Sequence, residues 1–204
     1  ISEQTKQDII QFLGISESKI KVIYQGCQAV FKEIYTDSQK QNLRTKYNLP
    51  NQFVLNVGTL EPRKNAFALV KAIKNIDTHL VLVGNETNYC KKIKTYIADN
   101  QLQKKVIFLN GLNSQELAIL YQAATVFAYP SLFEGFGIPI IEALFSKTPV
   151  STTNSGVFPE AGGPDSIYID PSNVAEIQEK IEFLLTNEEK RIEIAEKGFI
   201  FAQK

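Results

Sequence analysis

Short apolar runs, each closed by a glycine or a proline, recur along this chain and constrain its fold more than any other feature. Four of them are VLNVGT, LVLVGN, IFLNGL and FAYPS, which end around Gly58, Gly84, Gly111 and Pro130. Continuous apolar runs of this length predict strands that are covered on both faces. Longer amphipathic stretches separate them. This alternation predicts βαβ units around a parallel sheet, which is a Rossmann-like, doubly wound α/β fold.

The pattern predicts seven strands and seven helices. The strands span 21–24, 53–57, 79–83, 106–109, 125–129, 149–152 and 166–169. The helices span 3–13, 65–75, 88–99, 114–123, 138–146, 174–185 and 188–201. The segment 25–50 is interpreted as a connection with a short helical pattern that ends at Pro50. Because the first helix and strand are too small to fold alone, we expect two units, the tail of another domain with a linker over 1–34 and a main domain over 35–204.

Composition excludes several classes of function. Lys+Arg and Asp+Glu both number 22 among 204 residues, and this zero net charge argues against a nucleic-acid surface or a polybasic membrane patch. No run reaches the ~20 apolar residues that span a bilayer, and the first residues do not resemble a signal peptide. The chain has no methionine, which indicates an excerpt of a longer protein.

Cysteine and histidine are too few for a metal site of the usual kind. Cys27 and Cys90 lie far apart, and His79 is the single histidine. We favour two free thiols and leave a disulfide open. His79 opens a predicted strand and is interpreted as structural.

The segment FEGFGIPIIE, residues 133–142, is the strongest candidate for a binding site. It places Glu134 and Glu142 on either side of a turn that contains Gly135 and Gly137. Glycines let the backbone approach a ligand closely, and Pro139 suits the first turn of the helix that follows. Free N–H groups at a helix start bind anions, whereas carboxylates suit hydroxyls. Together they predict a site for hydroxyls that flank phosphates, as in a nucleotide-sugar.

A second candidate, GTLEPRKN, follows the first strand of the main domain. Gly58 allows close backbone approach, and Arg63 and Lys64 add two cations suited to a departing diphosphate. A basic pair alone is more often a solvated helix face. We nevertheless expect this pair to face Glu134, because ligands in open α/β sheets bind at the carboxyl ends of the strands.

These blocks, taken in order, carry a family resemblance. The blocks GTLEPRKN, HLVLVG and VIFLNGLNSQELAILYQAATVFAYPSLFEGFGIPIIEALFSKTPV resemble the C-terminal donor-binding domain of family 4 retaining glycosyltransferases of the GT-B fold. Glu134 and Glu142 match the E-x7-E signature of that family. Upstream, SEQTKQDIIQFLGISESKIKVIYQG resembles the end of its N-terminal domain and the linker. GTLEPRKN is similar to bacterial mannosyltransferase-like members that build surface polysaccharides.

The resemblance implies a role for each matched residue. Glu142 holds the ribose hydroxyls, Glu134 contacts the transferred sugar, and Arg63 and Lys64 bind the diphosphate and stabilise the leaving group. The implied catalytic set is Glu134, Arg63 and Lys64. The implied donor-binding set is Gly58, Thr59, Arg63, Lys64, Gly84, Asn110, Gly111, Leu112, Ser131, Glu134, Gly135, Phe136, Gly137, Ile138 and Glu142. Glu116 and Glu160 match less diagnostic positions.

The resemblance also implies the reaction and the partners. A hexose moves from a nucleotide-diphosphate sugar to a glycan or lipid-linked acceptor with retention and without metal or cofactor. The acceptor site belongs to an N-terminal domain outside this chain, so we expect the chain to bind donor but not to transfer sugar. The expected location is the cytoplasm, including the inner face of the membrane by peripheral association.

Three other functions are weighed against this one. A two-carboxylate glycosidase requires an acid whose pKa is raised by an apolar pocket, and nothing flanking Glu134 or Glu142 in the sequence predicts one. A dinucleotide-binding domain requires G-x-G-x-x-G after the first strand, which GTLEPRK does not match. A non-catalytic nucleotide-sugar-binding module remains the alternative.

Overall fold

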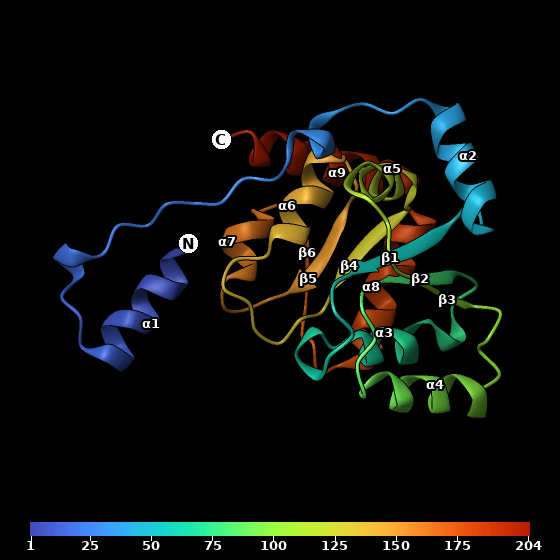
Figure 1. The fold of residues 1–204 in the computed structure, drawn as a ribbon, viewed down its shortest axis with the longest axis horizontal. Helices are drawn as coiled ribbons and strands as arrows, with labels where there is room; N and C mark the ends of the chain where they lie inside the picture. Colours follow the sequence, from blue (N-terminus) through green and yellow to red (C-terminus); the bar gives the residue numbers. More distant parts are fainter.

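The computed structural model describes all residues, 1–204, and its centre is a six-stranded parallel sheet with the order β3-β2-β1-β4-β5-β6 (Figure 1). The strands are β1 (Phe53–Val57), β2 (His79–Val83), β3 (Val106–Leu109), β4 (Val126–Tyr129), β5 (Val150–Thr153) and β6 (Ile167–Ile169). All five strand pairs are parallel. The doubly wound α/β prediction is therefore confirmed.

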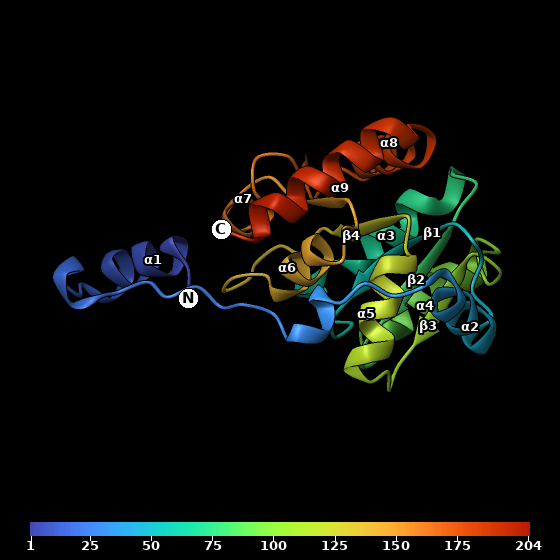
Figure 2. The ribbon, with the colours of Figure 1, turned by 90° about the horizontal axis from the view of Figure 1, so that it is seen from above.

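Helices cover both faces of the sheet, as Figure 2 shows from above. One face carries α2 (Asp37–Tyr47), α5 (Ser114–Ala123), α6 (Ile138–Phe145) and α7 (Phe158–Gly162); the other carries α3 (Ala66–Ala72), α4 (Cys90–Asp99) and α8 (Val174–Thr186). Helix α9 (Glu188–Ala202) packs on α6 and α8. None of the helices combines the length and apolar character needed to cross a bilayer.

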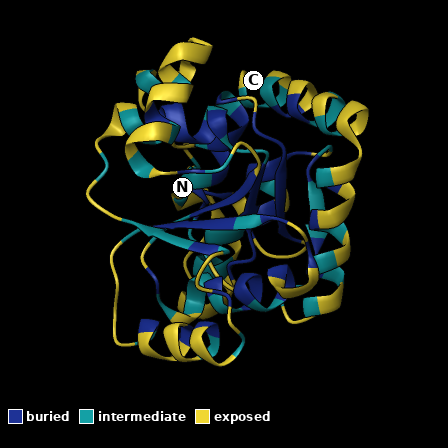
Figure 3. Ribbon diagram, turned by 90° about the vertical axis from the view of Figure 1, so that its right-hand side faces the viewer, coloured by how far each residue is buried: buried dark blue, intermediate teal, exposed yellow.

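Alternate residues of each strand supply the two halves of the core. In β1, Phe53 and Leu55 enter the cluster under α5 and α6, whereas Val54 enters the cluster under α3 and α8. The strands in the middle of the sheet are mostly dark blue in Figure 3 and the outer helix faces mostly yellow, so the sheet is the buried layer. This two-sided burial explains why most strands are continuously apolar in sequence. The exception is β5, VSTT, where the buried hydroxyls of Thr152 and Thr153 donate to backbone carbonyls of Tyr129 and Ser131.

The N-terminal piece projects from this body and contacts it at the start of α1 (Figure 1). Helix α1 (Glu3–Leu13) has the predicted bounds, with Ser2 as its N-cap and Gly14 in a left-handed conformation at its end. The strand predicted over 21–24 is wrong, since these residues are extended but pair with no strand. A β-prone run becomes a strand only when a neighbouring strand supplies its hydrogen bonds, and here residues 21–24 run between α1 and the body with no strand beside them (Figure 1).

Two further helices lie where the sequence predicted little. Helix α2 corresponds to the short helical pattern expected before Pro50 in the connecting segment, and Thr36 and Gln39 form a reciprocal capping box at its start. Its sequence is polar and Leu43 is its one buried residue, so apolar periodicity indicated little. The short helix α7 was not predicted. Other differences are small: α4 begins at Cys90, and a 3₁₀ turn (Ile73–Asn75) follows α3.

The strand ends bring two predicted glycines into contact. The N–H of Gly58 donates to the Val83 carbonyl (2.8 Å) and that of Gly84 to the Leu109 carbonyl (3.0 Å), so the turns after β1, β2 and β3 lie in a row. Gly84 has a φ of +150°, and a Cβ there would lie 2.1 Å from the Gly58 carbonyl oxygen. Only glycine fits this position.

Gly84→Ala should therefore lower the free energy of unfolding by about 3 kcal/mol, from backbone overlap added to an unfavourable φ. Gly111→Ala is the matched control. Its φ is +69° and a Cβ would meet nothing within 4 Å, so a loss of about 1 kcal/mol is expected. Urea denaturation of both variants measures the difference, and equal losses would contradict the close-approach explanation.

Candidate functional site

The two sequence candidates meet where the winding of the sheet reverses, between β1 and β4. The loop after β1 includes the 3₁₀ turn Pro62–Lys64, and the loop after β4 runs into the glycine turn. The carbonyl of Arg63 accepts from the N–H of Leu132 (2.8 Å) and also lies 3.1 Å from the Ser131 hydroxyl oxygen. Below them, the buried Asn56 amide donates to the Ala128 carbonyl (2.8 Å). These bonds join the two loops.

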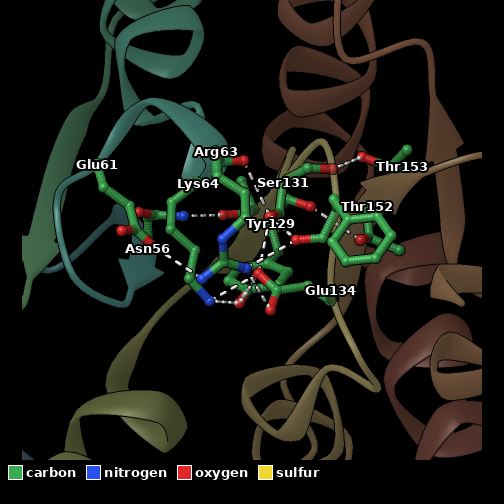
Figure 4. A network of polar contacts seen from close by, with 11 residues as sticks. Asn56, Glu61, Arg63, Lys64, Tyr129, Ser131, Glu134, Thr152 and Thr153 are labelled. Atoms are coloured by element: carbon green, nitrogen blue, oxygen red, sulfur yellow. Dashed lines mark hydrogen bonds and ion pairs between the residues drawn. The ribbon is translucent and has the colours of Figure 1, made fainter. Parts of the chain in front are cut away.

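Glu134 is the centre of the polar network drawn in Figure 4. Its Oε1 accepts from Lys64 Nζ (2.6 Å), the Tyr129 hydroxyl (2.9 Å) and the Ser131 hydroxyl (2.8 Å). Its Oε2 pairs with Arg63 Nη1 at 2.8 Å. Burial acts to raise the pKa of Glu134, but the hydrogen bonds and the Lys64 charge outweigh it and hold the pKa below its usual value. Glu134 is therefore an ionised acceptor.

This network limits what each member can still bind. A carboxylate offers about four lone-pair positions, and Oε1 already accepts three hydrogen bonds. Oε2 accepts from Arg63 alone and keeps room for one further donor. The Lys64 side chain is 13% exposed and that of Arg63 41%, so Arg63 is the accessible cation. Arg63 also pairs with Glu61 through Nη2 (2.7 Å), which balances two cations with two carboxylates.

The glycine turn presents unpaired backbone donors beside Glu134. The N–H groups of Gly135, Phe136, Gly137 and Ile138 donate no hydrogen bond within the protein. Gly137 has a φ of +113° and directly precedes α6, whose first turn contains Pro139. Four free N–H groups at a helix start form an anion-binding surface.

The N-terminal helix touches the same turn. The Gly135 carbonyl accepts from the hydroxyls of Ser2 (2.8 Å) and Thr5 (3.2 Å). The Glu160 carboxylate accepts from the N–H groups of Glu3 (2.7 Å) and Gln4 (3.4 Å). The start of α1 therefore lies against the turn through hydrogen bonds to both the loop and α7.

Glu142, the second carboxylate of the motif, has a different environment. It lies one helical turn into α6, and its Oε2 accepts from the hydroxyl of Tyr121 on α5 (3.0 Å). Burial raises the pKa of Glu142 to about 7, although the Tyr121 hydrogen bond acts in the opposite direction. The expectation that nothing around the motif raises an acid's pKa is therefore wrong for Glu142, because packing of α5 on α6 supplies an environment that the flanking sequence does not reveal.

Comparison with known proteins decides the family. A model described as glycosyl transferases group 1 matches residues 37–200. The chain belongs to this family. The O-antigen chain mannosyltransferase RfbU of Salmonella typhimurium is 31% identical over 175 residues, which cover 85% of this chain and 46% of that protein. The serotype-specific mannosyltransferase WbdA of Escherichia coli is 28% identical over 202 residues, 92% of this chain and 24% of that protein. The chain thus spans about half or less of these relatives.

Solved GT-B glycosyltransferases share the fold of this group 1 glycosyltransferase chain. HepE of Anabaena, in complex with UDP and glucose, superposes with a TM-score of 0.90 at 24% identity, over 99% of this chain and 56% of that one. The C-terminal domain of a group 1 glycosyl transferase family protein, LpcC of Francisella tularensis, has a TM-score of 0.72 at 23% identity, over 83% of this chain and 93% of that one.

The other predicted residues of this glycosyltransferase chain fall into two groups. Gly58, Thr59 and Gly84 lie at the carboxyl ends of β1 and β2, beside the Arg63 loop. Asn110 and Gly111 are exposed after β3 and Leu112 packs on the core, and no hydrogen bond joins these three to the Glu134 network. They share the sheet edge with the network, but β2 and β1 lie between β3 and β4.

The sequence did not reveal two tyrosines of the site. It gave little weight to Glu116 and Glu160, and this agrees with the structure. Tyr129 was predicted only as the last residue of a strand and Tyr121 only as part of a helix, although both donate to the motif's carboxylates. The one sequence feature that could have indicated Tyr129 as a site residue is its position two residues before Ser131, at the carboxyl end of a predicted strand. Glu116 and Glu160 have structural partners: Glu116 caps α5 and pairs with Lys46 (2.5 Å), while Glu160 binds α1. Cys27 and Cys90 are both free thiols, as favoured.

The raised pKa of Glu142 predicts a pH-dependent cost of folding. The carboxyl ionises near 4.5 when unfolded and near 7 when folded, so the folded state holds the extra proton between these values and stability falls as pH rises through that window. Glu142→Gln removes this loss. The free energy of unfolding of Glu142→Gln, relative to wild type, should therefore be higher at pH 8 than at pH 4.5. The expected increase is about 1–2 kcal/mol, after discounting for partial exposure.

Urea denaturation at the two pH values measures this difference. Glu134→Gln is the contrasting variant, because its carboxylate is stabilised in the folded state and its loss should destabilise the chain at pH 8. A Glu142→Gln advantage that is equal at both pH values would contradict the assignment.

Proposed function

We propose that this chain is the donor-binding part of a retaining glycosyltransferase. The enzyme transfers a hexose, with mannose favoured, from a nucleotide-diphosphate sugar to a glycan or lipid-linked acceptor in surface-polysaccharide synthesis. The observation that carries the proposal is the convergence of Arg63, Lys64, Glu134 and the free N–H groups of the glycine turn at the β1–β4 switch point. The mannosyltransferase relatives and the UDP and glucose bound by HepE support it.

In this proposal the diphosphate binds between Arg63 and the start of α6. Arg63 is the more exposed cation and keeps N–H donors beyond those bound to Glu61 and Glu134. The N–H groups of residues 135–138 bind the oxygens on the other side. As the bond to the sugar breaks, negative charge grows on the diphosphate, and these preorganised donors stabilise it. Lys64, held beneath, contributes charge and keeps Glu134 ionised. The expectation that no metal is required stays a prediction.

The two carboxylates bind hydroxyls at either end of the donor. Glu134 accepts one hydrogen bond from the transferred hexose through Oε2, the oxygen that keeps room for a donor. Glu142 accepts from the ribose. Neither is proposed as the nucleophile, because Glu134 already accepts hydrogen bonds from three side chains and pairs with Arg63, and Glu142 is assigned to the ribose. The loop 110–112 is proposed to contact the base.

The remaining site residues are proposed to come from outside this chain. Residues 1–34 are proposed as the tail of an acceptor-binding domain with its linker, and residues 35–204 as the donor domain. The contacts of Ser2 and Thr5 with Gly135 support a closed arrangement of the two parts. The proposed location is the cytoplasm, at the inner face of the membrane where lipid-linked acceptors occur.

A thermal-shift screen of GDP-mannose, UDP-glucose and ADP-glucose tests the proposed function. At least one should raise the melting temperature in a concentration-dependent way, because ligands that bind only the folded state stabilise it by mass action. The same chain should transfer no sugar to acceptors, since the acceptor site is proposed to lie elsewhere. Absence of any shift would contradict donor binding. Sugar transfer by this chain would contradict the proposal that the acceptor site lies outside it.

Substitutions separate the two ends of the donor. Arg63→Ala should lower the affinity for a nucleoside diphosphate by about tenfold or more, because charge-assisted hydrogen bonds to phosphate are lost. The affinity for the nucleoside should not change. Glu142→Ala should lower the affinity for the ribose nucleotide by about tenfold. The affinity for the 2′,3′-dideoxy nucleotide, which lacks the hydroxyls, should not change. Calorimetry measures both.

Lys147→Ala is the matched control for lost charge, since Lys147 pairs with Glu196 at the far end of α6 (2.9 Å). It should bind as wild type. Equal affinities of wild type and both site variants for every ligand would reject the two assignments.

A further inference from the structure

Tyr121 is a fully buried polar side chain whose hydroxyl reaches one carboxylate of the motif. It lies on α5, is 0% exposed, and donates to Glu142 Oε2 at 3.0 Å. Its ring packs edge-on against Phe31 (5.8 Å) and Phe127 (5.2 Å). Its backbone carbonyl accepts from the Thr148 hydroxyl (2.7 Å). The ring is therefore held from several sides, and its hydroxyl has a fixed position.

The hydrogen bond from Tyr121 is the one that the Glu142 side chain makes within the protein. The titratable groups facing Glu142 are Cys27 from the linker, Tyr121 from α5 and Tyr129 from β4, and none is a cation. Glu134, in contrast, has two cations and two hydroxyls. The Tyr121 hydroxyl is thus the group that opposes the cost of keeping a charge on Glu142.

We propose that Tyr121 is a positioning residue for donor binding, whose O–H holds the Glu142 carboxylate in the charged form and orientation that accept the ribose hydroxyls. The inference rests on the proposed function, which assigns the ribose to Glu142. A carboxylate accepts both hydroxyls of a ribose, whereas a protonated carboxyl has lost part of that capacity. Tyr121 occupies Oε2 and leaves Oε1 free for the ligand.

This role has a pH signature that a purely structural tyrosine lacks. The pKa of Glu142 lies near 7, so donor affinity should rise with pH through neutrality and reach a plateau above it. Removing the O–H donor destabilises the charged form and raises this pKa further. The rise in affinity then moves to higher pH. Burial also raises the pKa of the Cys27 thiol, so Cys27 stays protonated through this range.

The test is the affinity of the chain for GDP-mannose, UDP-glucose and ADP-glucose, measured by calorimetry from pH 5.5 to 8.5. In Tyr121→Phe the midpoint of the profile should move up by about one pH unit, with affinity about tenfold weaker at pH 6.5 and within about threefold of wild type at pH 8.5. The ring packing is retained in this variant, so circular dichroism should be unchanged.

Two controls isolate the contact. Tyr47→Phe removes the hydroxyl of another tyrosine that donates to a glutamate on α5, Glu116 Oε1 at 2.9 Å, and should leave the profile unchanged. Glu142→Gln should abolish the pH dependence, and adding Tyr121→Phe to it should produce no shift of the profile.

The outcomes distinguish the inference from the proposed function. A Tyr121→Phe profile with the wild-type midpoint, or one weakened equally at every pH, overturns the role of Tyr121. If Tyr121→Phe does not fold, the test compares the pH profiles of donor affinity of wild type and Glu142→Gln. If these two profiles coincide, the inference is overturned. Failure of wild type to bind any of the three nucleotide-sugars at any pH contradicts the proposed function itself.

Discussion

The pairing of β1 with β4 is the constraint on which the site depends. Because these neighbours are parallel and the winding reverses between them, the loops after both strands leave the same edge of the sheet and diverge to opposite faces. The loop after β1 leads to α3 on one face, and the loop after β4 leads to α6 on the other. Arg63, Lys64 and Glu134 meet in the space between, about 70 residues apart in sequence but 2.6–2.8 Å apart in the structure.

Two carboxylates of one motif differ in charge because their surroundings differ. Both are removed from water, and burial acts to raise the pKa of each. Glu134 has Arg63, Lys64 and two hydroxyls to compensate, whereas Glu142 has Tyr121 alone. One residue is therefore anionic at every physiological pH and the other titrates near neutrality. A raised carboxyl pKa is typical of a general acid, but the ligand proposed for Glu142 is a hydroxyl pair, for which the charged form is the better acceptor.

How much the sequence could predict follows from the kind of information that each feature needs. The sheet strands are predictable because most are continuous apolar runs and β5, VSTT, is rich in β-branched residues; α1 is predictable because Ser2 and Gly14 mark its ends. The residues 21–24 look like a strand locally, yet strand formation requires a partner that only the fold specifies. For α2 the sequence indicated only a short helical pattern without bounds, because Leu43 is its one buried residue and its start is fixed by capping and not by an apolar stripe. The meeting of Arg63 with Glu134 was predictable because both follow strands at the carboxyl edge of a parallel sheet. The bond from Tyr121 to Glu142 was not, since it depends on how α5 packs on α6.

The charge balance of the site suggests why the cations are held by a carboxylate and not left free. Glu61 and Glu134 together neutralise Arg63 and Lys64, so the folded chain carries no excess charge at the loop junction before a ligand binds. A pair of free cations would repel each other there. In the proposed function, with the pair already neutralised, affinity for the diphosphate comes from the spare N–H donors of Arg63 and from the four free amides at the start of α6. Those groups are directional hydrogen-bond donors, so they bind the oxygens of a correctly placed diphosphate more strongly than they bind anions in general.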